Sequence, residues 1–116
     1  MIGYIRLGNF NMGMLPDAAP EPGETVLALD RSHPVLGNHR HVLLNPNDPA
    51  ERTRVIAAYR ADMDADFATH APMYWAVREL ANRVNSGEKI VGMCHCAPRA
   101  CHVEVIIERV NEILAC

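Results

Sequence analysis

Hydrophobic positions along the chain form two kinds of pattern, short continuous runs and longer periodic stretches. Apolar runs at 1–7, 25–29 and 89–93 are bounded by charged or turn-forming residues such as Gly8-Asn9. Continuous runs of this length are typical of strands buried in a parallel sheet. A further short strand is expected at 41–44. Residues 12–24 contain three prolines and few apolar anchors, which predicts a flexible loop.

Three stretches repeat apolar residues at steps of three and four, which predicts amphipathic helices. The first begins at Asp48, an expected N-cap, with Pro49 at the first helical position and Glu51 placed to accept from free N–H groups. Its apolar stripe consists of Val55, Ile56, Tyr59, Met63 and Phe67. A second helix is expected from Pro72 to the Asn85-Ser86-Gly87 stop signal, and a third over 101–114.

The order of these elements is strand, loop, strand, helix pair, strand, helix. Strands separated by helices favour parallel pairing, with the helices packed on the sheet. The sequence therefore predicts an α/β fold, with a parallel sheet of three to four strands flanked by helices. A chain of 116 residues supports one hydrophobic core, so a single domain over 1–116 is expected.

Composition and charge limit the partners that the chain is expected to have. The net charge is −3, and the basic residues are spread along the chain, so bulk binding of nucleic acid is disfavoured. No apolar run approaches the roughly 18 residues of a membrane span, and the first residues do not resemble a signal peptide. We therefore expect a cytoplasmic protein without membrane contact, and the sequence is compatible with a homo-oligomer.

Ligands of open α/β sheets bind beyond the carboxyl ends of the strands, which directs attention to the residues after Leu29 and after Met93. The segment at 94–102 holds five Cys or His residues in nine positions. One hypothesis is a reactive thiolate at Cys101, because a helix N-terminus, His102 and Arg99 would all lower the pKa of its thiol. Another is a zinc site that uses Cys94, Cys96, Cys101 and His102. The single residue between Cys94 and Cys96 argues against zinc, so no cofactor is expected. The alternative is a purely structural role, in which the thiols are small buried hydrophobic groups and His102 only caps a helix.

The segment at 30–41 carries two Arg and three His residues. Gly37-Asn38 can adopt positive φ and present backbone N–H groups, so with Arg31 and Arg40 this loop fits a phosphate or carboxylate ligand. The alternative is a solvated loop, since Arg and His are ordinary surface residues. Tyr74 and Trp75 are aromatic candidates for stacking on a base, although helix packing is the default role of such residues.

Taken together, these motifs resemble a family of small uncharacterised domains from phages and bacteria. The resemblance rests on Ser32-x-Pro-x-Leu-Gly-Asn38, on Arg52 with Val55-Ile56 and Tyr59, and on Cys94-x-Cys-x-Pro-x-x-Cys-His102. It implies a Rossmann-like α/β fold, a pocket near Arg31, Asn38, Cys96, Cys101 and His102, and the host cytoplasm if a phage encodes the protein. This chain has His39 where the family usually has Pro, His95 where it has an aromatic residue, and Val103-Glu104 where it has Gly-Asp.

The leading hypothesis is a protein that binds a small nucleotide- or nucleoside-related ligand between these two loops. The expected ligand-binding residues are Arg31, Ser32, Gly37, Asn38, Cys94, Cys96 and Arg99. If the ligand is processed, hydrolysis or transfer at a glycosidic or phosphoryl centre suits the setting, with Cys101, His102 and Glu104 as catalytic candidates. The alternatives are a non-catalytic module that sequesters a ligand or binds a host protein, and a small structural zinc domain.

Overall fold

The computed structural model describes residues 2–9, 21–29, 33–38, 41, 44–45, 47–94 and 102–115, and every structural statement below concerns these residues. The elements are β1 (Tyr4–Asn9), β2 (Thr25–Ala28), α1 (Pro49–Thr69), α2 (Pro72–Asn85), β3 (Lys89–Cys94) and α3 (His102–Ala115). Their order agrees with the predicted one. Of the loop expected at 12–24, residues 12–20 lie outside the described part, and 21–23 lead through a turn toward β2. The strand expected at 41–44 is not seen at His41 or Leu44, and residues 42–43 lie outside the described part.

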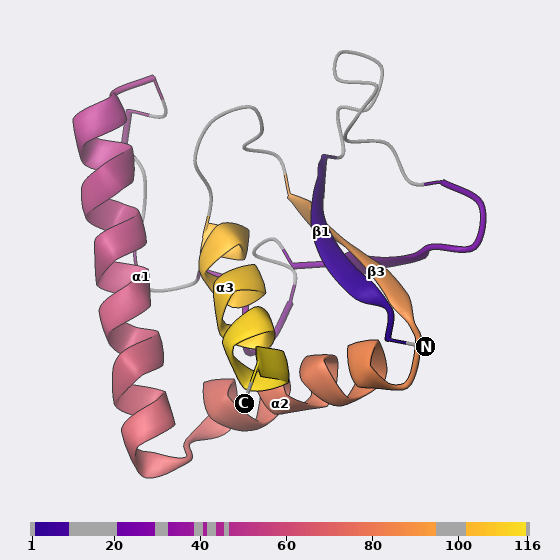
Figure 1. Cartoon of the computed structure of the whole chain (residues 1–116). Helices are drawn as coiled ribbons and strands as arrows, with labels where there is room; N and C mark the ends of the chain where they lie inside the picture. Colours follow the sequence, from indigo (N-terminus) through magenta and orange to yellow (C-terminus); the bar gives the residue numbers. More distant parts are fainter. Residues whose placement is uncertain are drawn as a thin grey trace.

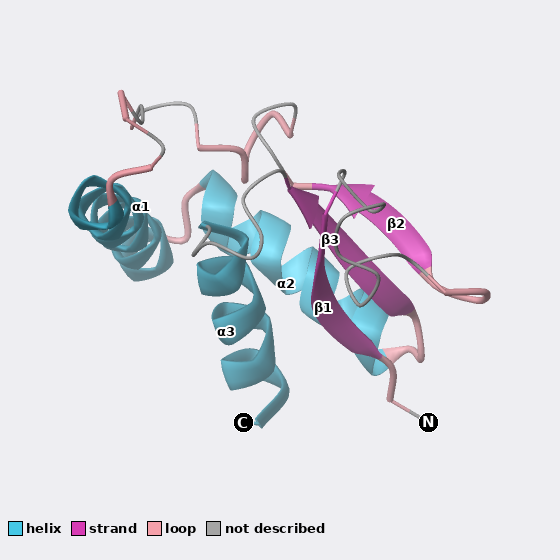
Figure 2. Ribbon diagram, turned by 90° about the horizontal axis from the view of Figure 1, so that it is seen from above, coloured by secondary structure: helices cyan, strands magenta, loops and turns pink. Residues whose placement is uncertain are grey.

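The three strands form a parallel sheet in the order β1-β3-β2, so the last strand in sequence lies at the centre. The α/β class and the parallel sheet are therefore confirmed. The three helices lie together on one side of this sheet (Figures 1 and 2). No helix in the described ranges is both long and apolar enough to span a bilayer.

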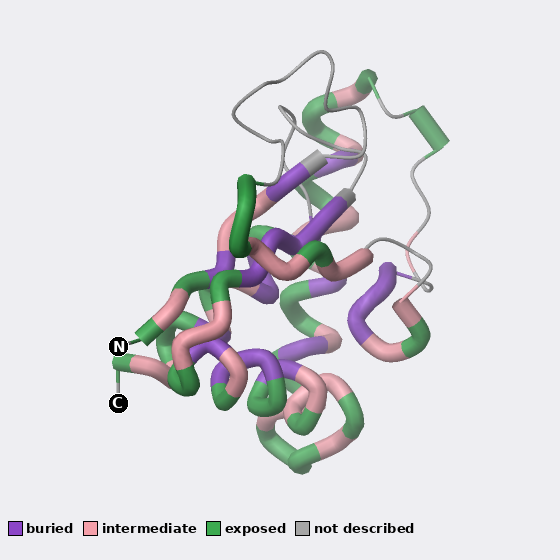
Figure 3. The backbone as a smooth tube through the Cα atoms, turned by 90° about the vertical axis from the view of Figure 1, so that its right-hand side faces the viewer, coloured by how far each residue is buried: buried purple, intermediate pink, exposed green. Residues whose placement is uncertain are grey.

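The core lies between the sheet and helices α2 and α3. Ile5 and Ile90 face these helices and are 6% and 0% exposed, and Val77 and Ile106 complete the contact from the helix side. Figure 3 shows the buried backbone running through the strands and along the inner faces of the helices. Gly92 permits a close approach of α3, because a Cβ there would lie 2.8 Å from Leu29 Cδ1 and 3.2 Å from Val103 Cγ1.

Helix α1 begins where the sequence predicted. Asp48 is the N-cap, and its Oδ1 accepts from the backbone N–H of Ala50 at 2.9 Å. Glu51 accepts from the N–H groups of Leu44 and Asn45, so it holds the preceding turn rather than closing a reciprocal box with the cap. The helix is therefore capped and tied to the chain segment that leads into it.

Two ion pairs join α1 to α3. Arg60 contacts Glu108 at 2.5 Å, and Arg109 pairs with Asp64 while its guanidinium lies 4.9 Å from the ring centroid of Phe67. Both side chains of the Arg60–Glu108 pair are close to half exposed. These contacts orient α1 as the outer helix of the molecule.

The sheet face opposite the helices carries a charged cluster, which we call the clasp: Tyr4, Arg6 and Glu24. Arg6 lies beside Val91 of the central strand, and its guanidinium donates to both carboxylate oxygens of Glu24 at 2.8 and 2.7 Å. Tyr4 also donates to Glu24, whose side chain is 1% exposed. The Arg6 hydrogen bonds lower the pKa of Glu24 to about 2. The clasp thus links β1 across β3 to the residue that precedes β2.

Candidate functional site

Parallel strands end at one edge of the sheet, and His102 begins α3 at that edge. Its Nε2 lies 2.7 Å from the carbonyl oxygen of Leu29, directly after β2. Because a carbonyl oxygen can only accept, Nε2 carries the proton, and in the neutral ring Nδ1 is the basic nitrogen. The His102 side chain therefore joins the start of α3 to the end of β2 through a buried hydrogen bond.

Tyr59 of α1 extends this contact toward the other unusual loop. Its ring meets that of His102 edge to face, with the centroids 5.0 Å apart. Its hydroxyl donates to the carbonyl oxygen of Leu36 at 2.7 Å, and the residue is 2% exposed. We call Leu29, Leu36, Tyr59 and His102 the edge cluster. Tyr59 therefore contacts both the segment at 33–38 and His102, the first residue of α3.

The segment at 33–38 is a compact turn organised by His33. Its Nδ1 accepts from the N–H groups of Val35 and Leu36 at 3.2 and 2.8 Å, and Gly37 N–H donates to the His33 carbonyl at 3.2 Å. The turn places Gly37 and Asn38 in buried positions. Asn38 Oδ1 in turn accepts from the N–H of His41 at 3.2 Å. These local hydrogen bonds satisfy backbone N–H groups that have no partner in a helix or a strand.

A cavity of about 190 Å³ lies between this turn and helix α1. It is lined by Val35, Gly37, Asn38, Tyr59, Asp62, Asp66 and Met73. Asp62 Oδ2 lies 2.7 Å from Nε2 of His41, and Asp66 Oδ2 accepts from the N–H of Met73 at 2.9 Å, near the start of α2. The cavity thus combines apolar walls with two carboxylates and one amide.

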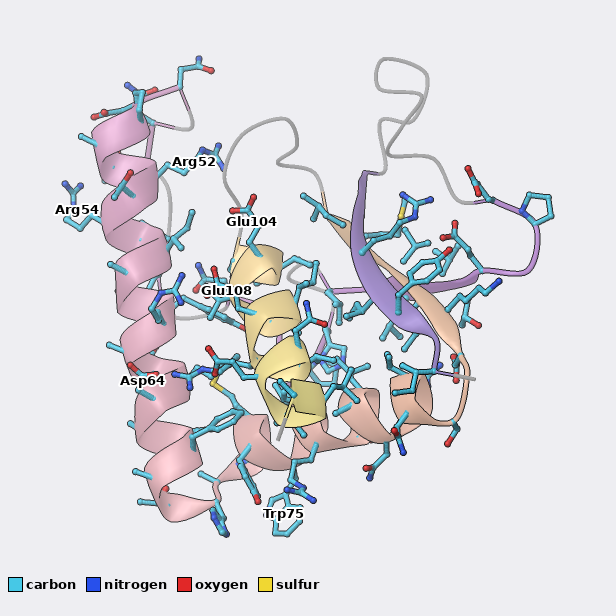
Figure 4. All side chains as sticks on the ribbon, in the orientation of Figure 1. Arg52, Arg54, Asp64, Trp75, Glu104 and Glu108 are labelled. Atoms are coloured by element: carbon cyan, nitrogen blue, oxygen red, sulfur yellow. The ribbon has the colours of Figure 1, made fainter. Side chains whose placement is uncertain are left out.

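Three of the predicted site residues are brought close to one another. Gly37 and Asn38 line the cavity, and His102 touches its wall through Tyr59. Glu104 is exposed in the first turn of α3, and Figure 4 shows its side chain at the end of that helix where the strands also end.

The remaining predicted site residues are placed only in part. Cys94 is the last residue of β3, where its backbone is in register with Asn9 of β1. Arg31, Ser32, Cys96, Arg99 and Cys101 lie outside the described residues. Their roles therefore stay predictions.

The zinc hypothesis also stays a prediction, because two of its four ligands, Cys96 and Cys101, lie outside the described residues. Among the described side chains, no group of three or more His, Cys, Asp or Glu residues is arranged to hold a metal ion. If His102 were a ligand, its Nδ1 would have to face the metal while Nε2 keeps its bond to Leu29.

Helix α1 contributes residues that the sequence analysis did not assign to the site. Tyr59 was expected only as a core residue, and Asp62 and Asp66 were not considered. Arg52 lies two helical turns before Tyr59, is 7% exposed and reaches from α1 toward the side where α3 begins (Figure 4). A charged residue in the apolar stripe of a helix is the signal that would have drawn attention to this face.

The two aromatic stacking candidates lie elsewhere. Tyr74 packs on His70 with ring centroids 4.1 Å apart, and on Phe67 at 5.2 Å. Trp75 is 59% exposed, and Figure 4 shows it at the far end of the molecule from Glu104. Packing at the junction of α1 and α2 is therefore the role that the structure gives Tyr74.

Fold and cavity together define a small α/β protein in which Tyr59 joins the turn at 33–38 to the start of α3, beside the carboxyl edge of a parallel sheet. Residues 18–112 match a family model described as a domain of unknown function (DUF4326), and the chain belongs to this family. The match is consistent with the uncharacterised family that the motifs suggested. Neither the curated proteins nor the solved structures yielded a match to the chain.

Proposed function

We propose that this protein binds a small nucleotide- or nucleoside-related ligand at the carboxyl edge of its sheet, in the manner of Rossmann-like folds. The observation that carries the proposal is the edge cluster. Through Tyr59 it brings His102, from one unusual loop, next to the turn that holds Gly37 and Asn38, from the other. A cavity with polar and apolar walls lies at this junction, which is the composition expected of a small-molecule site.

The anionic part of the ligand would be bound by arginines of the two loops. Arg31 and Arg99 are the candidates, because a guanidinium binds phosphate through two parallel hydrogen bonds. Ser32, Cys94 and Cys96 complete the proposed ligand-binding set. The ligand would be met in the cytoplasm, where such anions are abundant.

Hydrolysis or group transfer is the reaction class that suits this setting. In hydrolysis, Glu104 or Nδ1 of His102 would take a proton from the attacking water and return it to the leaving group, so that no co-reactant is needed. Cys101 is the candidate nucleophile if the group is transferred through the protein. His102 could not use Nε2 for this purpose while that atom donates to Leu29.

A non-catalytic binding module is the second candidate function. It is favoured by the same bond, because the His102 side chain is already committed to a backbone carbonyl and packed on Tyr59. In that case the protein would sequester the ligand, or present it to a host protein, without turning it over.

Calorimetric titration with a panel of nucleotides and NAD-derived metabolites tests the binding proposal. We expect at least one of them to bind, and Arg31→Ala to weaken binding at least tenfold. Arg54→Ala is the matched control, because Arg54 is exposed and points away from the molecule (Figure 4). No binding by the wild type, or equal binding by Arg31→Ala and the control, would overturn the proposal.

The variant His102→Gln separates the two functions. The glutamine amide can still donate to the Leu29 carbonyl, but it has no basic nitrogen in place of Nδ1. If the protein is an enzyme that uses His102, this variant binds ligand but turns it over at least a hundredfold more slowly. If neither the wild type nor Cys101→Ser shows turnover of a bound ligand, the binding module is the correct function.

A further inference from the structure

The described cavity has a charge that does not suit the anionic part of a nucleotide. Asp62 and Asp66 are one helical turn apart on α1, and both line the cavity. A negative charge placed beside these carboxylates would be repelled, although Asp62 is also in contact with His41. A phosphate therefore suits this cavity poorly. A ligand that also carries a phosphate must insert a different part.

Asn38, in the turn at 33–38, adds a side-chain amide to the lining of the cavity. The residue is 8% exposed, and its Oδ1 is identified by the N–H of His41 that it accepts. The amide nitrogen Nδ2 has no hydrogen-bond partner among the described residues. In that part of the chain, every side-chain nitrogen or oxygen that is fully buried does have a partner. Nδ2 is therefore not fully buried, and Asn38 is one of the residues that line the cavity.

Asp66 supplies an acceptor to the lining of the same cavity. Its Oδ2 caps the start of α2 through the N–H of Met73, which orients the carboxylate and leaves Oδ1 to accept a further bond. Val35 and Met73 provide apolar surface between the polar groups. The cavity thus combines an acceptor, a donor and apolar surface within about 190 Å³, which is smaller than the roughly 300–1,000 Å³ of a site for a drug-sized ligand.

We propose that this cavity binds the edge of a nucleobase that carries an exocyclic amino group. Asp66 Oδ1 would accept the amino N–H, and Asn38 Nδ2 would donate to the adjacent ring nitrogen or carbonyl. Uracil fits less well, because carbonyl oxygens flank its single N–H and would face the carboxylates of Asp62 and Asp66. This inference rests on the proposed function, and it adds the base class that the site selects.

Cytidine monophosphate and uridine monophosphate are the most informative pair of probes. On the base edge that would enter the cavity, cytosine carries an amino group where uracil carries a carbonyl. We expect calorimetry to show at least tenfold tighter binding of cytidine monophosphate. In Asp66→Asn the side-chain oxygen can still accept from the N–H of Met73 and cap α2. The amide NH2 group then takes the place of Oδ1, so the cavity gains a donor and loses an acceptor. This variant should lose or invert the preference while its melting temperature changes little.

Asp64→Asn is the matched control, because it removes the same charge from α1 at a side chain that pairs with Arg109 instead of lining the cavity (Figure 4). Asn38→Asp is a second variant, which keeps an oxygen for His41 but removes the donor, and it should weaken cytidine monophosphate at least tenfold. If both nucleotides bind equally, or if Asp66→Asn leaves the preference intact, the base inference is wrong while the proposed function stands. If no nucleotide binds, the proposed function fails and this inference fails with it.

Discussion

Two polar clusters tie distant segments together in this protein, and they do so with different chemistry. In the edge cluster, the side chains of His102 and Tyr59 donate to backbone carbonyls. The clasp uses an arginine and a carboxylate on the opposite face of the sheet. The bonds of the edge cluster do not require a charge, whereas those of the clasp depend on the ionisation of Glu24.

This difference bears on how the candidate site is built. Next to the proposed ligand, the edge cluster joins the turn at 33–38 to the start of α3 through hydrogen bonds to backbone carbonyls and a ring contact. Contacts between ionisable side chains lie on the far face, between α1 and α3, and also at the cavity, where His41 contacts Asp62.

The largest expected effect is that of His102→Ala. The change leaves the Leu29 carbonyl without its partner and removes a ring packed on Tyr59, so we expect a loss of roughly 2–4 kcal/mol in the free energy of unfolding. Urea denaturation followed by circular dichroism measures it. His102→Gln keeps the donor and should lose less than half as much. Equal losses in the two variants would show that the hydrogen bond to Leu29 contributes little.

A smaller effect, with a clear pH dependence, is expected for Glu24→Gln in the clasp. At pH 7 the variant loses charge-assisted hydrogen bonds to Arg6, which contribute about 1.5–3 kcal/mol. The pKa of Glu24 is lowered by Arg6 from 4.5 to about 2 in the folded protein, so this contribution is present above pH 4.5 and is lost as the pH falls toward 2.

Urea titrations between pH 7 and pH 2.5 test the comparison of the two clusters. The stability difference between wild type and Glu24→Gln should shrink over the acid range, while the difference between wild type and His102→Gln should not follow the same curve. Arg60 and Arg83 also lower the pKa values of Glu108 and Glu88, but both pairs are present in all three proteins and cancel in the difference. A constant difference for Glu24→Gln would contradict the account of the clasp.

The smallest effect is expected for Arg60→Ala. Its pair with Glu108 joins α1 to α3 between side chains that are 44% and 49% exposed. Exposed ion pairs contribute at most about 1 kcal/mol, and salt screens them. The loss measured by urea denaturation should therefore fall below that value and disappear in 1 M NaCl. If Arg60→Ala lost as much unfolding free energy as Glu24→Gln, the exposure of the side chains would not explain the difference between the Arg60–Glu108 and Arg6–Glu24 pairs.

The helices and strands were predictable because their signals are local. The cap at Asp48, the break at Pro72 and the stop at Gly87 act within a few residues, and the apolar period marks the buried face. The local signal was less informative about Glu51, whose partners proved to be the N–H groups of the preceding turn. The partners of Glu51 depend on how the chain enters the helix, and the spacing of residues in the sequence does not predict that path.

The candidate site could be predicted only in part. Gly37, Asn38 and His102 were chosen because they follow strands that end at one edge, and these residues do lie close to the same tyrosine. Asp62 and Asp66 were missed because they flank the apolar stripe of α1 and resemble ordinary solvated acids. They line a cavity only because the turn at 33–38 packs against that side of the helix.

By itself the sequence determined the α/β class, the ends of the helices and the two loops in which chemistry was to be sought. These features follow from hydrophobic period, capping and turn residues, all of which act over short distances. Only the tertiary structure decided that the helices lie on one side of the sheet, that Tyr59 joins the turn at 33–38 to the start of α3, and that two carboxylates line the cavity beside them. Those outcomes depend on contacts between residues far apart in the chain, which are set by how whole elements pack and not by local sequence.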